Sequence, residues 1–149
     1  MTDKLTVYTD GGCTGNPGPG GWAAVLLKDS KVLEELSGGE SATTNNRMEM
    51  TAVIKVLEWI LRQGQPVPSV ELYTDSQYVQ KGISEWMKNW LAKGWKTAAG
   101  KPVKNRDLWM RMNELAQQVQ ISWHWVKGHA GHQWNERCDE LVAAERAKY

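Results

Sequence analysis

The stretch Lys4-Leu5-Thr6-Val7-Tyr8-Thr9-Asp10, followed by Gly11-Gly12, decides how the rest of the chain is interpreted. Its β-branched and aromatic residues predict a buried strand, and the two glycines allow the backbone to turn sharply directly after Asp10. Ligands of open α/β sheets bind beyond the carboxyl ends of the strands. Asp10 is therefore the first candidate for chemistry.

The composition is typical of one soluble globular domain. The 149 residues are 41% hydrophobic and 23% charged, with a net charge of +1, which predicts a single domain over 1–149. No apolar run approaches the roughly 20 residues of a membrane span, and the N-terminus lacks the apolar stretch of a signal peptide. Cys13 and Cys138 lie far apart without nearby metal-ligand partners, so we expect reduced structural thiols and a cytoplasmic location.

The strand pattern predicts an α/β fold with a mixed sheet. A turn-rich loop at 13–21 leads to strands at 22–27 and 32–37, the second closed by Gly38-Gly39, and these would form an antiparallel meander with the first strand. Two more strands are expected at 70–75 and 121–126. Helical crossovers would make them parallel to the first strand, so their carboxyl ends meet at one edge of the sheet.

Helices are expected between and after these strands. Residues 43–46 supply helix-capping side chains, and the apolar residues that follow recur at helical spacing up to Gly64. Gly82 is expected to break the next helical stretch in two. The predicted segments after the first helix are 76–81, 83–91, 107–119 and 133–147.

Two carboxylates stand in the same local pattern at strand ends, in Tyr8-Thr9-Asp10 and Tyr73-Thr74-Asp75. An isolated aspartate in this position more often caps the following turn. Two of them on adjacent strands raise each other's pKa unless a cation lies between them. Their hard oxygen ligands suit Mg²⁺ or Mn²⁺.

Three further residues have ordinary structural interpretations that compete with a catalytic one. Asn46-Arg47-Met48-Glu49 fits a capping box, although Glu49 also flanks the apolar stripe and can face the end of the sheet. Asp139 alone is a solvated helix charge, one turn after Asn135, and His129 alone is a solvated loop residue. With the two aspartates they make four carboxylates and a histidine without a Ser or Cys nucleophile, which indicates metal-assisted hydrolysis.

The chain resembles ribonuclease H type I along nearly its whole length. The blocks that carry the resemblance are YTDG (8–11), GNPGPGG (15–21), TTNNRME (43–49), TDSQYV (74–79), WVKGHAGH (125–132) and NERCDEL (135–141). The resemblance implies a ribonuclease H-like fold, with a five-stranded mixed sheet flanked by helices. The sequence departs from the family at Gln133-Trp134, where a Pro-Glu type of helix start is expected.

The resemblance also implies an activity: hydrolysis of the RNA strand of RNA–DNA hybrids with two divalent ions, leaving 5′-phosphate and 3′-hydroxyl ends. The ions would be Mg²⁺, with Mn²⁺ as a substitute. Asp10 would bridge both ions, Glu49 and Asp75 would serve one, and Asp139 would serve the other. His129 would assist proton transfer or product departure, and we expect a monomer.

A substrate surface follows from the same resemblance. The RNA strand would be held, partly through the 2′-hydroxyl groups that distinguish RNA from DNA, by Cys13, Asn16, Asn45, Asn46 and Gln77. The DNA strand would be held by Thr44, Trp86, Trp90 and Asn105. A basic protrusion at about 83–104 would help through Lys88, Lys93 and Lys96, because tryptophans interleaved with cations are costly to expose without a partner.

Three rival functions are weighed against this one. A hybrid-binding module without catalysis would share the fold, but the full set of four carboxylates and His129 argues against it. An aspartyl-phosphate phosphatase needs a second Asp two positions after Asp10, where this chain has Gly12. A transposase or junction resolvase would use similar acids, and the Trp-rich basic protrusion and the TTNN block at 43–46 disfavour it.

Overall fold

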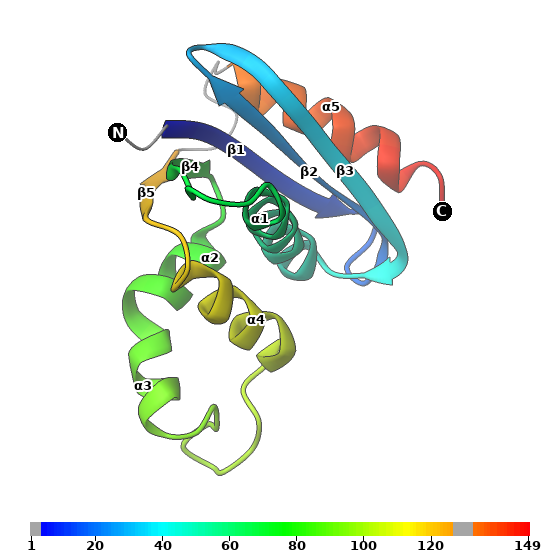
Figure 1. The fold of residues 1–149 in the computed structure, drawn as a ribbon. Coiled ribbons are helices and arrows are strands. Elements are labelled where there is room, and N and C mark those ends of the chain that lie inside the picture. The colour runs from blue at the N-terminus through cyan, green and yellow to red at the C-terminus, as the bar shows by residue number, and fades with distance from the viewer. Residues whose placement is uncertain (1–3, 127–132) are drawn as a thin grey trace.

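A five-stranded mixed sheet runs through the middle of the protein (Figure 1). The computed structural model describes residues 4–126 and 133–149. The strands are β1 (Lys4–Cys13), β2 (Gly18–Lys28), β3 (Lys31–Thr43), β4 (Ser69–Thr74) and β5 (Ile121–Trp125), in the order β3-β2-β1-β4-β5. The first three form an antiparallel meander, and β4 and β5 extend the sheet in parallel with β1. The predicted α/β fold with a mixed sheet is confirmed.

Helices cover both faces of the sheet. They are α1 (Asn45–Arg62), α2 (Gln77–Lys81), the π-helical segment η1 (Gly82–Trp86), α3 (Met87–Ala92), α4 (Arg106–Ala116) and α5 (Gln133–Arg146). In Figure 1, α1 and α5 lie on opposite sides of the meander, and α2, α3 and α4 form a lobe below the sheet. Within the described ranges, no helix is both long enough and apolar enough to span a membrane.

The alternation of side chains along β2 shows how the sheet separates two apolar cores. Ala24 and Leu26 belong to the larger core, which α1 and α4 complete. Ala23, Val25 and Leu27 belong to the smaller core, which includes Cys138 and Val142 of α5. Because successive strand residues point to opposite faces, a strand buried on both faces is apolar at almost every position.

The meander strands are longer than the sequence predicted. β2 begins at Gly18, inside the expected loop, and β3 continues past Gly38 and Gly39 to Thr43. A side chain at Gly38 would lie 2.8 Å from the indole ring of Trp22, across the β2–β3 pair. These glycines therefore make room for close packing inside the sheet and do not end the strand.

The predicted helix break at Gly82 is also wrong. The helical backbone continues from α2 through η1 into α3, with one widened π-helical turn beginning at Gly82. A Cβ atom at this position would collide with the Trp109 ring, and Trp109 is fully buried. Gly82 is therefore present because the helix crosses directly over an indole.

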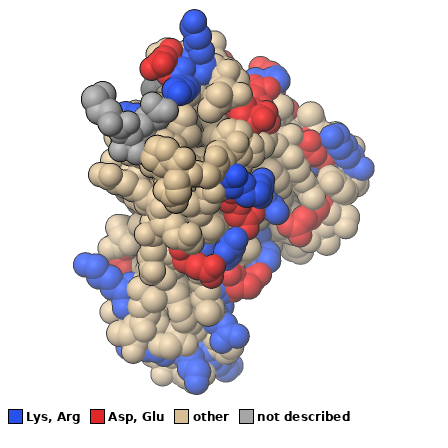
Figure 2. All heavy atoms as spheres, viewed as in Figure 1, with Lys and Arg blue, Asp and Glu red and all other residues tan. Residues whose placement is uncertain are grey.

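Charge is unevenly distributed over the surface. Figure 2 shows lysine and arginine side chains gathered around the lower lobe, where α3 and the loop before α4 lie, while acidic groups concentrate closer to the sheet. Every basic residue between Lys88 and Arg106 is exposed, and this interval contains no acidic residue. The lobe is accordingly a cationic surface of the kind that attracts phosphates.

Candidate active site

The parallel pairing of β1 with β4 brings two carboxylates together. Tyr8 and Tyr73 are direct partners in this pairing, and an aspartate stands two residues beyond each tyrosine. Asp10 and Asp75 therefore occupy equivalent places, two residues beyond the last paired residues of β1 and β4. Asp10 is only 8% exposed, and the backbone N–H of Gly11 donates to its Oδ1 at 2.8 Å.

The third carboxylate comes from the first turns of α1. A Cβ atom on Gly11 would collide with the backbone of Met48, so only glycine lets the end of β1 approach the helix this closely. This approach places Glu49 beside Asp10. Gly11 is thus required for the close contact with α1. It does not form the sharp turn that the sequence predicts, because β1 continues through it to Cys13.

The capping-box interpretation of Glu49 is wrong. The helix cap is Thr44, whose Oγ1 accepts from the backbone N–H of Arg47 at 3.2 Å. The residue three positions after this cap is Arg47, which leaves Glu49 free of a capping role. One carboxylate oxygen from each of Asp10, Glu49 and Asp75 lies within 4.8 Å of the other two.

The electrostatics of this triad favour a bound cation. Burial, followed by the charges of Asp10 and Asp75 and a hydrogen bond with Asp10, raises the pKa of Glu49 well above its usual value, and only the backbone N–H of Gly11 opposes these effects. Glu49 Oε2 is buried without a hydrogen-bond partner in the part of the chain that the structure describes. Converging hard oxygen ligands with an unsatisfied acceptor fit a divalent ion such as Mg²⁺ or Mn²⁺. The triad could hold a metal ion.

The other two residues expected in the catalytic set are placed differently. Asp139 is exposed on α5, and it is not part of the converging group found among the described residues. His129 lies outside the described residues. Sequence reasoning noted Asn135 only as a neighbour of Asp139, yet Thr9, Asp10, Asp75 and Asn135 line one small hollow at the strand ends.

Three of the five residues expected to contact RNA form a hydrogen-bonded cluster at the start of α1. Asn45 Oδ1 accepts from the backbone N–H of Cys13 at 2.8 Å, and the backbone N–H of Asn45 donates to Asn16 Oδ1 at 3.1 Å. Asn46 follows within the same helical turn. Gln77 is exposed as the first residue of α2. The structure therefore joins three of the five residues directly.

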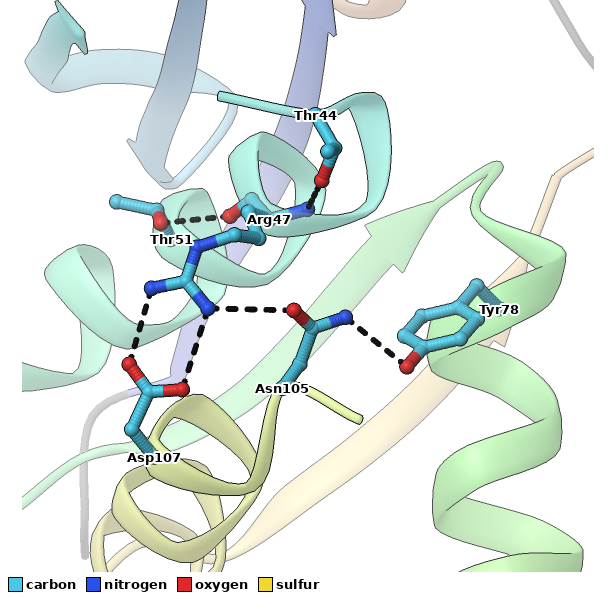
Figure 3. A network of polar contacts seen from close by, with 6 residues as sticks. All are labelled: Thr44, Arg47, Thr51, Tyr78, Asn105 and Asp107. Carbon is cyan, nitrogen blue, oxygen red and sulfur yellow. Dashed lines mark hydrogen bonds and ion pairs between the residues drawn. The ribbon is translucent and has the colours of Figure 1, made fainter. Parts of the chain in front are cut away.

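The residues expected to contact DNA lie around a second polar network (Figure 3). Arg47 Nη1 donates to Asn105 Oδ1 at 3.2 Å, and Asn105 Nδ2 donates to the hydroxyl of Tyr78 at 3.1 Å. Asn105 has a left-handed backbone, with φ of 60°, which Asn tolerates better than most residues. The position of its amide is thus fixed from both sides, by partners that the sequence did not reveal.

The tryptophans of the protrusion pack mainly against one another. The ring centroid of Trp90 lies 5.7 Å from that of Trp86, 6.2 Å from Trp95 and 5.5 Å from Trp109. Trp86 and Trp90 also line a shallow pocket with Tyr78 and Lys104. These indoles therefore need an external partner less than the sequence suggests, because the fold itself covers much of their surface. Lys88, Lys93 and Lys96 are exposed around this cluster.

Comparison with solved structures defines the class of the fold. The chain is similar to LC9-RNase H1, described as a type 1 RNase H with the type 2 active-site motif, with a TM-score of 0.88 and 30% identity over 99% of this chain and 74% of the other. It is also similar to LC11-RNase H1, solved in complex with an RNA/DNA hybrid, with a TM-score of 0.76 and 25% identity over 97% of each chain. The fold is that of a ribonuclease H domain.

The sequence comparisons then identify the family. The RNase H family model matches residues 2–147. The chain is 59% identical to the ribonuclease H of Cupriavidus necator over 139 residues, which are 93% of this chain and 92% of the relative. It is 56% identical to the ribonuclease HI of Caulobacter vibrioides over 142 residues, which are 95% and 92% of the two chains. The chain belongs to the ribonuclease H family, in its bacterial HI type, and is an endoribonuclease.

Proposed function

We propose that this enzyme hydrolyses the RNA strand of RNA–DNA hybrids with two Mg²⁺ ions, which Mn²⁺ can replace, and leaves 5′-phosphate and 3′-hydroxyl ends. The observation that carries the proposal is the convergence of Asp10, Glu49 and Asp75, where β1, β4 and the start of α1 meet. The likeness to a ribonuclease H1 solved with an RNA/DNA hybrid supports this substrate. The enzyme acts as a monomer in the cytoplasm.

Each acidic residue has a role in this proposal. Asp10 would hold both ions, Glu49 and Asp75 would complete the ligands of one ion, and Asp139 would serve the other. When bound, two such ions would supply the Lewis-acid chemistry that activates a water and stabilises a leaving 3′-oxygen in an in-line displacement. Burial of Asp10 limits the access of bulk water to the site, and His129 assists proton transfer or product departure.

One polar network contacts the RNA strand of the substrate, and the other contacts the DNA strand. The cluster of Cys13, Asn16 and Asn45 presents amide groups that can donate to and accept from 2′-hydroxyls. Thr44 and Asn105 lie at the junction of α1 and α4, and they contact the DNA strand together with Trp86 and Trp90. The exposed lysines of the protrusion supply phosphate contacts that do not depend on sequence.

The test is a side-by-side incubation of end-labelled RNA–DNA hybrid, duplex RNA and duplex DNA with Mg²⁺ or with EDTA. We expect cleavage of the hybrid alone, in the RNA strand, and only with the metal. The new RNA ends should be substrates for a ligase that requires a 5′-phosphate and a 3′-hydroxyl. Binding without cleavage would support the hybrid-binding module, and cleavage of all three duplexes would contradict the assigned specificity.

A paired substitution connects this activity to the acidic triad. Asp10→Asn should abolish cleavage and leave hybrid binding largely intact, because it removes the negative charge shared by both ions. Asp29→Asn is the matched control, since Asp29 is exposed in the turn between β2 and β3. Turnover by Asp10→Asn close to that of the wild type would contradict the metal assignment.

A further inference from the structure

A buried amide in the acidic hollow has no role in the function described so far. Asn135 lies near the start of α5 and is only 7% exposed. It lines the hollow that Thr9, Asp10 and Asp75 also line. Its side-chain nitrogen, Nδ2, is buried and has no hydrogen-bond partner among the described residues.

An unpaired buried N–H is costly because it has given up its hydrogen bonds to water. Native proteins rarely retain such a group without a reason. The carboxylates of Asp10 and Asp75 are strong acceptors that line the same hollow, yet neither forms a hydrogen bond with Nδ2. The amide N–H is therefore available to donate a hydrogen bond to an oxygen atom of a species that Asp10 and Asp75 bind.

The chemistry of the amide is specific for this place. It donates a hydrogen bond without bringing a positive charge that would compete with a cation, and without a negative charge that would add to the repulsion among the carboxylates. Mg²⁺ bound by a few carboxylates keeps several of its water molecules. Hydrogen bonds from the protein to such outer groups tune metal affinity.

We propose that Asn135 is a positioning residue of the metal site, whose side-chain N–H donates to a water molecule in the hydration shell of an ion held by Asp10 and Asp75. This inference rests on the proposed function, because it requires an ion at the triad. It adds a neutral donor from α5 to the converging carboxylates of Asp10, Glu49 and Asp75. The start of α5 is thereby connected to metal binding as well as to the smaller core.

The other buried polar atoms without partners do not offer the same combination. Glu49 Oε2 belongs to the triad itself. Thr43 Oγ1 stands at the end of β3 and lines none of the acidic hollow. His124 Nε2 lies 3.4 Å from Glu71 Oε1 and so already has an ionic neighbour.

The test is metal binding without substrate, measured by titration calorimetry with Mg²⁺ and by electron paramagnetic resonance with Mn²⁺. Asn135→Ala removes the donor and should weaken ion binding roughly tenfold, at the lower end of the usual effect of outer-shell groups. Asn135→Asp has nearly the same shape but carries a negative charge, so it should tighten ion binding. Asn113→Ala, at a half-buried position of α4, is the control and should bind the ion as the wild type does.

The outcomes separate this inference from the proposed function. If the wild type binds Mg²⁺ and cleaves hybrid while both Asn135 variants bind the ion unchanged, the inference is overturned and the proposed function stands. Unchanged ion affinity with a raised KM for hybrid would assign the amide to the substrate, and would also overturn it. If Asn135→Ala fails to fold, as judged by circular dichroism, the ion affinity of the nearly isosteric Asn135→Asp decides whether the inference stands. A wild type that neither binds Mg²⁺ nor cleaves hybrid overturns the proposed function itself.

Discussion

Arg47, in the first turn of α1, forms a two-pronged ion pair with Asp107, in the first turn of α4. Nη2 lies 2.9 Å from Oδ2 and Nη1 lies 3.2 Å from Oδ1. The hydrogen bond and charge of the guanidinium lower the pKa of Asp107, and the carboxylate raises the pKa of Arg47 in turn. The same Nη1 also donates to Asn105, so this pair holds the amide that is expected to meet the DNA strand (Figure 3).

Arg47→Ala should therefore affect substrate binding more than stability. The two side chains are 33% and 65% exposed, and exposed ion pairs contribute only about 0.2–1 kcal/mol. We expect a melting temperature a few degrees lower, a several-fold higher KM for hybrid and nearly unchanged kcat, because Asn105 loses one of the two partners that orient it. Thermal denaturation and steady-state kinetics on one hybrid measure these quantities.

Arg111→Ala is the matched control for this prediction. Arg111 pairs with Glu58 at 3.0 Å and so also joins α4 to α1, but no hydrogen bond connects it to Asn105 within the described part of the chain. It should lower stability by a similar amount and leave KM unchanged. Equal KM values for the two variants would show that Arg47 acts only through the helix pair.

The sequence predicted the parts of the site that depend on local pattern. Asp10 and Asp75 could be placed together because each follows an aromatic residue and a threonine at the end of a strand, and the helical crossover makes those strands parallel. The pairing of Arg47 with Asp107 spans 60 positions, and no local periodicity signals it. Local pattern does not reveal the role of Asn135 either, because that role depends on the tertiary packing that buries its amide without a hydrogen-bond partner.

Two glycines that predict the ends of elements lie inside continuous elements of the structure. Glycines 38 and 82 were interpreted as element ends because glycine lowers strand and helix propensity. In the structure both lie inside continuous elements, where an indole ring occupies the space of a side chain. At both positions a packing contact with an indole ring overrides the low strand or helix propensity of glycine. The sequence does not reveal this contact, because it depends on where the ring lies in the fold.

Gly82→Ala tests this packing contact. The added methyl group would meet the Trp109 ring, which is fully buried and cannot move away freely. Overpacking of this kind costs about 1–3 kcal/mol, so the free energy of unfolding in urea should fall by that amount. In Gly12→Ala, the nearest neighbour of the new Cβ would be 3.6 Å away, and this control should retain its stability. A fully stable Gly82→Ala would show that the π-helical turn can yield.

The raised pKa of Glu49 predicts how the metal-free protein responds to pH. A carboxyl group with a higher pKa in the folded state binds more protons there than in the unfolded chain. The contribution of Glu49 to the free energy of unfolding therefore falls as pH rises from the ordinary glutamate pKa through the raised folded value. Glu49→Gln removes this titration, so the metal-free variant should be more stable than the wild type at neutral pH, most clearly above the folded pKa.

Adding Mg²⁺ should reverse the order of the two proteins. The ion stabilises the wild type by binding only to the folded state, and it does so less in Glu49→Gln, which has lost one of the three carboxylates. Urea denaturation between pH 4 and pH 8, with EDTA or with Mg²⁺, measures both effects. In EDTA, a stability advantage of Glu49→Gln over the wild type that does not grow with pH would contradict the assigned direction, as would equal Mg²⁺ stabilisation of both proteins.

The lysines of the protrusion should act in substrate capture and leave the chemical step unchanged. Lys88, Lys93 and Lys96 are exposed beside the tryptophan cluster, which the fold already stabilises through its own ring contacts. Each phosphate contact that is lost should flatten the log–log salt dependence of binding by roughly 0.9 on the duplex-DNA scale. Changing all three lysines to Gln should raise KM, most at low salt, and leave kcat nearly unchanged, the pattern of lost uniform binding.

The control changes the exposed residues Lys31, Lys55 and Lys148 to Gln, which removes the same charge elsewhere. Both variants are assayed on one hybrid across a salt series. A collapse of kcat with KM and the salt slope unchanged would place the protrusion in the catalytic apparatus, and an equal slope for both variants would show that only net charge matters.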